Sequence, residues 1–296
     1  MKKTLRREHM GYVYILPWII GFLVFQLYPL AASLYYSFTS YNITSAPVWV
    51  GLENYVTMFT KDSQFFSSLL TTLKYVFMSV PMKICFALLV AVILNQKIRF
   101  INFYRTVLYI PSIFGGSVAV AILWRFLFMD SGLINQILRA LGVPAVQWLS
   151  SPKIALFTLS LLSVWQFGSS MVLFLAALKQ VPEDLHEAAR IDGASRVCIF
   201  FRITLPMITP VLFFNLLMQI VNAFQDFTGA FVITNGGPLK STYLFALKLY
   251  DEAFNYYKMG YASALSWVLF VMILLFTIVF FRFSEAATYY EDGGKM

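Results

Sequence analysis

The sequence predicts an all-α, polytopic membrane protein with six transmembrane helices, and two observations carry that prediction. Hydrophobic residues make up 59% of the 296 residues, whereas charged residues make up only 12%. A soluble domain carries about 25% charged residues. Long apolar segments recur along the chain, each of about the 20 residues that a helix needs to cross a bilayer. The chain is therefore expected to fold as a helix bundle in lipid.

Six segments have the length and polarity of a membrane-spanning helix. They cover residues 12–38, 72–95, 106–128, 154–178, 205–228 and 260–283. The first of them follows the basic sequence MKKTLRREHM and could be mistaken for a signal peptide. Its apolar run is longer than the roughly 7–15 apolar residues of a signal peptide. We expect it to be an uncleaved first span.

Lysine and arginine are divided unevenly between the two sides of the predicted bundle. Thirteen lie on the side of the N-terminus, and the other side carries only Lys61, Arg139, Lys153, Lys240, Lys248 and Lys258. Because cytoplasmic loops are enriched in positive charge, both termini and the loop at about 180–204 are predicted to be cytoplasmic. The outer loops are 39–71, 129–153 and 229–259, and the second is expected to hold a short helix. Residues 1–296 are predicted to form one domain in the plasma (inner) membrane.

The composition argues against several kinds of function. The net charge of +8 would suit a nucleic-acid partner in a soluble protein, but here the basic loops explain it. No nucleic-acid-binding motif is visible. Cys85 lies in a predicted span and Cys198 in a polar loop, so a disulfide is not expected. His9 and His186 are far apart and suggest no metal site. We predict no catalytic residue, metal or cofactor in this chain.

The segment from Glu187 to Pro206, EAARIDGASRVCIFFRITLP, is a charged island in an apolar chain. Pro182 suits the first position of a helix that leads into it. Gly193 permits a sharp change of direction, and Asp192 or Ser195 can cap a second short helix. These features fit either a helix pair that a partner covers or an amphipathic helix lying on the lipid surface.

This segment resembles the EAA loop in the membrane subunits of binding-protein-dependent ABC importers. The resemblance rests on the Glu-Ala-Ala sequence that begins at Glu187, on Gly193 six residues later, and on the terminal Leu-Pro. It implies a type I ABC importer permease in which two short cytoplasmic helices dock into a groove on an ATPase subunit. The docking residues that it implies are Glu187, Ala188, Ala189, Asp192, Gly193, Arg196, Leu205 and Pro206.

The resemblance also implies the other members of the complex. These are a second, homologous permease subunit, two ATPase subunits that bind ATP and Mg, and an extracytoplasmic solute-binding protein. ATP hydrolysis would then take place in the partner subunits and not in this chain. The docking loop would transmit the closure of the ATPase pair to the membrane helices.

A glycine-rich turn, TNGGP at residues 234–238, follows the fifth predicted span. A phosphate-binding loop needs Gly directly before Lys, but Leu239 precedes Lys240, so ATP binding is rejected. The turn resembles the TxGGP segment in one of the two permeases of carbohydrate ABC importers. Together with FRITLPMITP at the start of the fifth span, it implies a permease of the maltose and glycerol-phosphate type. The expected cargo is a sugar or oligosaccharide, neutral or acidic, with a phosphorylated polyol as the alternative.

Four polar residues recur at helical spacing along the fifth predicted span. They are Asn215, Gln219, Asn222 and Asp226. At about 100° per residue, they fall within a sector of roughly 60°. Such residues either bond helices to one another or line a water-filled path. We predict a sugar path, because amides and carboxylates suit sugar hydroxyls. The fourth span adds Gln166 and Ser170, and Trp165 either stacks on a sugar or packs in the core.

Lys83 lies near the middle of the second predicted span, where a lysine costs about 2.5–3.5 kcal/mol on insertion scales. We include it in the substrate path, but three interpretations remain open. It can form an ion pair with an acidic group, either Asp226 or one on the partner subunit. It can contact an anionic substrate. If the ends of the span are shifted, its side chain can instead extend to water.

Two other classes of membrane protein are alternatives to an importer subunit. A secondary transporter usually shows internal repeats and broken helices, and no repeat is visible here. An integral membrane enzyme needs a nucleophile, a metal cluster or paired acids near the membrane surface, and none stands out. Neither class explains the EAA-like segment.

Overall fold

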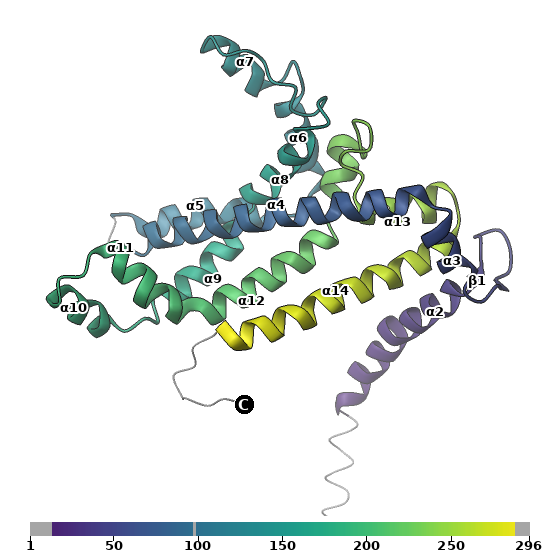
Figure 1. Cartoon of the computed structure of the whole chain (residues 1–296), viewed down its shortest axis with the longest axis horizontal. Coiled ribbons are helices and arrows are strands. Elements are labelled where there is room, and N and C mark those ends of the chain that lie inside the picture. The colour runs from purple at the N-terminus through teal and green to yellow at the C-terminus, as the bar shows by residue number, and fades with distance from the viewer. Residues whose placement is uncertain (1–13, 97–98, 288–296) are drawn as a thin grey trace, which may run out of the picture. The chain divides into compact units, whose positions relative to one another are not determined.

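The computed structural model describes residues 14–96 and 99–287, with side chains up to residue 282, and most of its regular structure is helical. The predicted all-α membrane protein is confirmed (Figure 1). The chain divides into two compact units, residues 1–65 with 249–271 and residues 66–248 with 272–296. Two long helices, α4 (Ser63–Leu94) and α14 (Met259–Ala287), contribute to both units.

The first unit combines a long helix at residues 14–37 with a small hairpin and a short helix. Its elements in chain order are η1 (Leu23–Leu27), α2 (Tyr28–Ser37), β1 (Thr39–Ser40), β2 (Val48–Trp49), α3 (Glu53–Thr60) and η4 (Asp251–Asn255). The strands pair antiparallel, with Thr39 opposite Trp49. A polar segment predicted only as the outer loop 39–71 is therefore largely structured.

The start of α14 packs closely against the hairpin of the first unit. A Cβ atom on Gly260 would lie 2.0 Å from the carbonyl oxygen of Thr39, so glycine is required there. At the next residue, the Tyr261 hydroxyl donates a hydrogen bond of 2.6 Å to the Asp62 carboxylate. The hydrogen bond and the close approach together fasten α14 to the segment that leads into α4.

The second unit is made of helices that pack around α9. Its elements are α5 (Ile101–Ile113), α6 (Val118–Phe128), α7 (Leu133–Ala140), α8 (Ala155–Trp165), α9 (Gly168–Leu178), α10 (Glu183–Ile191), α11 (Arg196–Ile199), η2 (Phe200–Thr204), α12 (Leu205–Phe224), η3 (Ala230–Thr234) and most of α13 (Phe245–Tyr250). Helices α5 and α12 both contact α9, and α6 contacts α8 and η3. The short helix predicted in the loop 129–153 is confirmed as α7.

Among the described residues, five helical segments are long and apolar enough to cross a membrane. They are Tyr14–Ser37, Ser63–Leu94, Val118–Ala140, Arg196–Phe224 and Met259–Arg282. The bent pair α8 and α9 makes a sixth if it is one span. The predicted number of six fits this arrangement. The basic N-terminal residues on which the predicted orientation partly rests lie outside the described residues.

The second span begins about nine residues before its predicted start. The Asp62 carboxylate accepts a hydrogen bond of 2.9 Å from the backbone N–H of Gln64 and so caps the N-terminus of α4. Helix α4 is therefore 32 residues long. The prediction used hydropathy alone, which does not register the polar first turns of a helix.

The third predicted span, 106–128, is wrong as a single helix. Helix α5 ends at Ile113 and α6 begins at Val118. Pro111 lacks a backbone N–H, and Gly116 has a φ of +73°, a conformation that disfavours residues with a side chain. These residues end α5, and the membrane-length segment in this region is displaced toward the C-terminus.

The fourth predicted span, 154–178, is also broken. Helices α8 and α9 meet at an angle of 49°, with Gln166 and Phe167 between them. A Cβ atom on Gly168 would lie 2.8 Å from both the Leu108 carbonyl oxygen and the Ser112 hydroxyl. The start of α9 therefore approaches α5 at a distance that only glycine allows.

Candidate functional site

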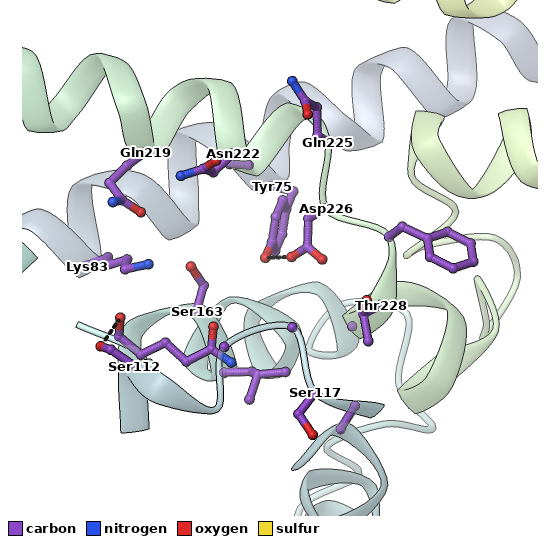
Figure 2. A pocket seen from close by; sticks show the side chains of 18 of the residues that line it. Tyr75, Lys83, Ser112, Ser117, Ser163, Gln219, Asn222, Gln225, Asp226 and Thr228 are labelled. Atoms are coloured by element: carbon purple, nitrogen blue, oxygen red, sulfur yellow. Dashed lines mark hydrogen bonds between the residues drawn. The ribbon is translucent and has the colours of Figure 1, made fainter. Parts of the chain in front are cut away.

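A polar cavity of about 450 Å³ lies within the second unit (Figure 2). Residues of α4, α12, the two helix breaks and the segment after α12 line it. Those with polar side chains are Tyr75, Lys83, Ser112, Ser117, Ser163, Gln166, Ser169, Gln219, Asn222, Gln225, Asp226 and Thr228. The concentration of amides, hydroxyls and two charged groups between apolar helices is typical of a path for a polar solute.

Helix α4 presents Tyr75 and Lys83 to this cavity from one face. The two residues are eight positions apart, which places them about two turns apart along the helix. The Tyr75 hydroxyl donates a hydrogen bond to the carboxylate of Asp226 (Figure 2). This bond joins α4 to the chain just beyond α12.

Lys83 extends into the cavity from the middle of α4 (Figure 2). The residue is only 9% exposed. One of the three interpretations left open for Lys83 was an ion pair with an acidic group such as Asp226, but no salt bridge within 4.0 Å joins Lys83 to a carboxylate of the described residues. Lys83 and Asp226 instead face the same cavity and interact across it without direct contact.

The four polar residues predicted on the fifth span have different surroundings. Gln219 and Asn222 line the cavity, as expected for a path. Asn215 is buried and accepts a hydrogen bond of 3.0 Å from the Ser170 hydroxyl of α9. Asp226 reaches the cavity from beyond the helix, because α12 ends at Phe224 and not near residue 228 as predicted. The helical spacing therefore placed Asn215 with the three cavity-lining residues, although Asn215 bonds α12 to α9.

The break between α8 and α9 brings Gln166 to the cavity. The Ser112 hydroxyl bridges this break, donating to the Gln166 carbonyl oxygen at 3.1 Å and accepting from the Ser169 N–H at 3.0 Å. Ser170, which we predicted beside Gln166, instead bonds to α12 and lies outside the cavity lining. Trp165 also lies outside it, with its ring centroid 6.0 Å from that of Trp124.

Several lining residues are not among those predicted from the sequence. Tyr75 precedes Lys83 by eight residues on one helical face, and this spacing is a usable signal. Ser112 lies in the last turn of α5 and Ser117 lies in the break between α5 and α6, in a segment predicted as a continuous helix. Their contribution depends on that break, for which the Gly115-Gly116 pair is the available signal.

A helical hairpin forms the segment that resembles the EAA loop. Helix α10 ends at Ile191, Gly193 has a φ of +78°, and the Ser195 hydroxyl caps α11 by accepting from the Cys198 N–H at 3.3 Å. The predicted turn and the Ser195 cap are confirmed. Pro182 lies one residue before the helix and not at its first position. Cys198 and Cys85 are both free thiols.

The second arm of this hairpin is continuous with a membrane helix. Helix α11 passes through η2 into α12, so that residues 196–224 form one helical segment. The expectation of two separate short helices is therefore wrong for the second one. His186 of α10 is joined to Thr204 by a hydrogen bond of 3.0 Å between Nε2 and Oγ1. This bond joins α10 to the last residue before α12.

The hairpin presents an exposed surface that combines acidic and apolar residues. Of the predicted docking residues in the hairpin, Glu187, Ala188, Asp192, Gly193 and Arg196 are exposed and Ala189 is partly exposed. The other two, Leu205 and Pro206, lie at the start of α12, where Leu205 is partly exposed and Pro206 is exposed. Ile191 is 86% exposed and Val197 is also exposed. Neighbouring apolar side chains that are this exposed on a helix pair are typical of a contact surface.

The TNGGP segment forms a tight turn, as predicted. Asn235 and Gly236 have φ values of +49° and +77°. The hydroxyls of Thr234 and Thr242 are 2.7 Å apart, and Thr242 also donates to the Gly237 carbonyl oxygen at 2.7 Å. These bonds give the turn a defined structure, and it lies outside the cavity lining.

Comparison with known proteins gives consistent matches. Residues 55–287 match the family model described as "Binding-protein-dependent transport system inner membrane component". The probable ABC transporter permease YesP of Bacillus subtilis is 50% identical over 99% of this chain and 96% of its own length. The trehalose/maltose permease MalF of Thermococcus litoralis is 35% identical over 95% of each chain.

A solved structure shares the fold. It belongs to a bacterial ABC transporter that imports the acidic polysaccharide alginate. The TM-score is 0.85 at 23% identity, and the match covers 97% of this chain and 99% of the other. At this identity the likeness concerns the fold alone.

Proposed function

Because this chain belongs to the family of inner membrane components of binding-protein-dependent transport systems, we propose that it is a sugar- or oligosaccharide-importing ABC permease subunit. The observation that carries the proposal is the polar cavity among membrane helices, with amide and hydroxyl groups on its wall. These groups both donate and accept hydrogen bonds, as sugar hydroxyls do. The trehalose/maltose relative supports the assignment to carbohydrate.

The proposed complex contains a second permease subunit, two ATPase subunits and an extracytoplasmic solute-binding protein. ATP and Mg bind to the ATPase subunits, and both termini of this chain lie in the cytoplasm. The exposed α10–α11 hairpin is the docking surface for an ATPase subunit. Its continuity with α12 supports this role, because α12 carries Gln219 and Asn222 to the cavity. Docking and cargo contact thus lie on one continuous helical segment.

The transport cycle follows from these positions. ATP binding closes the ATPase pair and shifts the hairpin, which biases the membrane helices toward the state open to the binding protein. The cavity receives the sugar, and hydrolysis returns the helices to the state open to the cytoplasm. This chain contributes binding groups and mechanical coupling, and the covalent chemistry takes place in its partners.

Reconstitution of the complete complex in proteoliposomes tests the proposal. Uptake of a labelled sugar from a panel of oligosaccharides should require both ATP and the binding protein. A complex whose ATPase subunits bind but do not hydrolyse ATP is the matched control, and it should not accumulate sugar. Uptake driven by an ion gradient without ATP would contradict the proposal and indicate a secondary transporter.

A further inference from the structure

We propose that the cavity takes an oligosaccharide that carries a carboxylate, and that Lys83 is the specificity-determining residue that binds this carboxylate. The inference rests on the proposed import function and names the class of its cargo. It also decides among the three interpretations that the sequence left open for Lys83.

The position of Lys83 favours an anion in direct contact with its ammonium group. Its side chain is buried to all but 9% and extends into the cavity (Figure 2). No described carboxylate forms a salt bridge with it within 4.0 Å. Removal of an ammonium group from water is costly unless a counter-charge and hydrogen bonds replace the water. An anionic group on the cargo supplies both when the cavity is filled.

Asp226 attracts Lys83 across the cavity but is not paired with it directly. Its carboxylate accepts a hydrogen bond from Tyr75, which precedes Lys83 by eight residues on the same helix. At about 1.5 Å per residue, the two positions on α4 are about 12 Å apart along the helix axis. The bond to Tyr75 therefore holds the Asp226 carboxylate out of salt-bridge distance of the Lys83 ammonium.

The remaining lining fits a neutral, hydroxyl-rich body attached to the anionic group. Gln166, Gln219 and Asn222 supply amides, and serines supply hydroxyls. Lys83 is the one cationic residue in the described lining. Lysine binds phosphate as well as carboxylate, but as a single point charge without the bidentate fork of an arginine. A carboxylate of single charge balances the one cation, whereas a phosphate dianion leaves excess negative charge in a cavity that also holds Asp226, so the charges of the lining favour a uronate-type sugar.

Ligand binding to the assembled complex tests the proposal without the binding protein, which has its own selectivity. The complex in nanodiscs is titrated with disaccharides of glucuronate, galacturonate and mannuronate, each beside its carboxyl-reduced neutral form. The readout is the ligand-dependent rise in Tm. At least one uronate should bind roughly tenfold to hundredfold more tightly than its neutral form, as expected for a charge-assisted hydrogen bond.

Two variants on α4 give the matched comparison. Lys83→Met roughly keeps the side-chain length and should abolish the preference for the uronate. Lys74→Met removes an exposed lysine from the same helix and should leave the preference unchanged. If Lys83→Met does not assemble, Lys83→Gln takes its place and should likewise lose the preference for the uronate.

Three results of the binding titration overturn the inference. They are the absence of any uronate preference in the wild type, a preference that survives in Lys83→Met, and tighter binding of glycerol 3-phosphate than of every uronate. In the transport assay, ATP-dependent uptake of a uronate oligosaccharide at equal rates in the wild type and Lys83→Met would also overturn this inference and leave the import function standing. Absence of ATP-dependent uptake for every sugar would instead contradict the import function itself.

Discussion

The hydrogen bonds between Ser170 and Asn215 join α9 to α12. Ser170→Ala should therefore lower the stability of the complex, by about 0.6 kcal/mol and at most about 1.7 kcal/mol, the range measured for bonds between membrane helices. Ser160→Ala is the matched control, because Ser160 is equally buried but donates to Leu156 of its own helix. Thermal unfolding of the two variants in parallel measures the difference. Equal loss of stability in both would contradict the proposed role of the bonds between helices.

For single residues, the sequence predicted which polar side chains lie in the membrane helices, but not what each one contacts. Gln219 and Asn222 line the cavity as predicted, whereas Asn215, on the same face, bonds to Ser170. Helical periodicity defines a face and does not say whether a helix or a cavity lies opposite. Tyr75 could not be paired with Asp226 from the sequence, because 151 residues separate them.

The turn at Gly193 determines the angle between α10 and α11. Its φ of +78° disfavours a residue with a side chain, and a Cβ atom there would have no neighbour within 4 Å, so the cost of substitution is conformational only. Gly193→Val should leave the complex assembled and reduce sugar uptake relative to ATP hydrolysis. Gly193→Asn is the matched control, because asparagine adopts this conformation more readily. Equal uptake per ATP in the two variants would show that the turn does not limit coupling.

Hydropathy predicted where the membrane helices lie, but it did not predict where they are broken. Both failures, at residues 106–128 and 154–178, fall at breaks that line the cavity. Gly168 gives the physical reason in the second case, because the close approach of α9 to α5 is a tertiary contact. Broken helices are also a usual sign of a secondary transporter. Their presence here means that this criterion does not separate the two classes, whereas the family match does.

The orientation of the whole chain can be tested by cysteine labelling in a background that lacks Cys85 and Cys198. Ile191 is 86% exposed and Leu239 is 90% exposed. Ile191→Cys should be labelled only from the cytoplasm and Leu239→Cys only from outside. The ATPase subunit should protect Ile191→Cys and leave Leu239→Cys unprotected. Reversed labelling would overturn both the orientation and the docking assignment.

For the molecule as a whole, the EAA-like segment was the most informative stretch of sequence. It is local, so its residues Glu187 to Gly193 lie together whatever the rest of the chain does. The cavity combines residues from α4 to the segment after α12, and their meeting depends on packing that no local pattern encodes. That the 296 residues form one domain stays a prediction.

The break between α8 and α9, which Ser112 bridges, limits how the substrate specificity of such a protein can change in evolution. Part of the surroundings of the cavity is main chain, at the Gln166 carbonyl and the Ser169 N–H. Nearly every amino acid has the same backbone N–H and C=O groups, so a point mutation does not change them. The residue at position 112 must also keep a side chain that both donates and accepts a hydrogen bond. Mutations that change the transported substrate are therefore expected at a few side chains, such as those of Lys83, Gln219 and Asn222, while the backbone around the cavity stays the same.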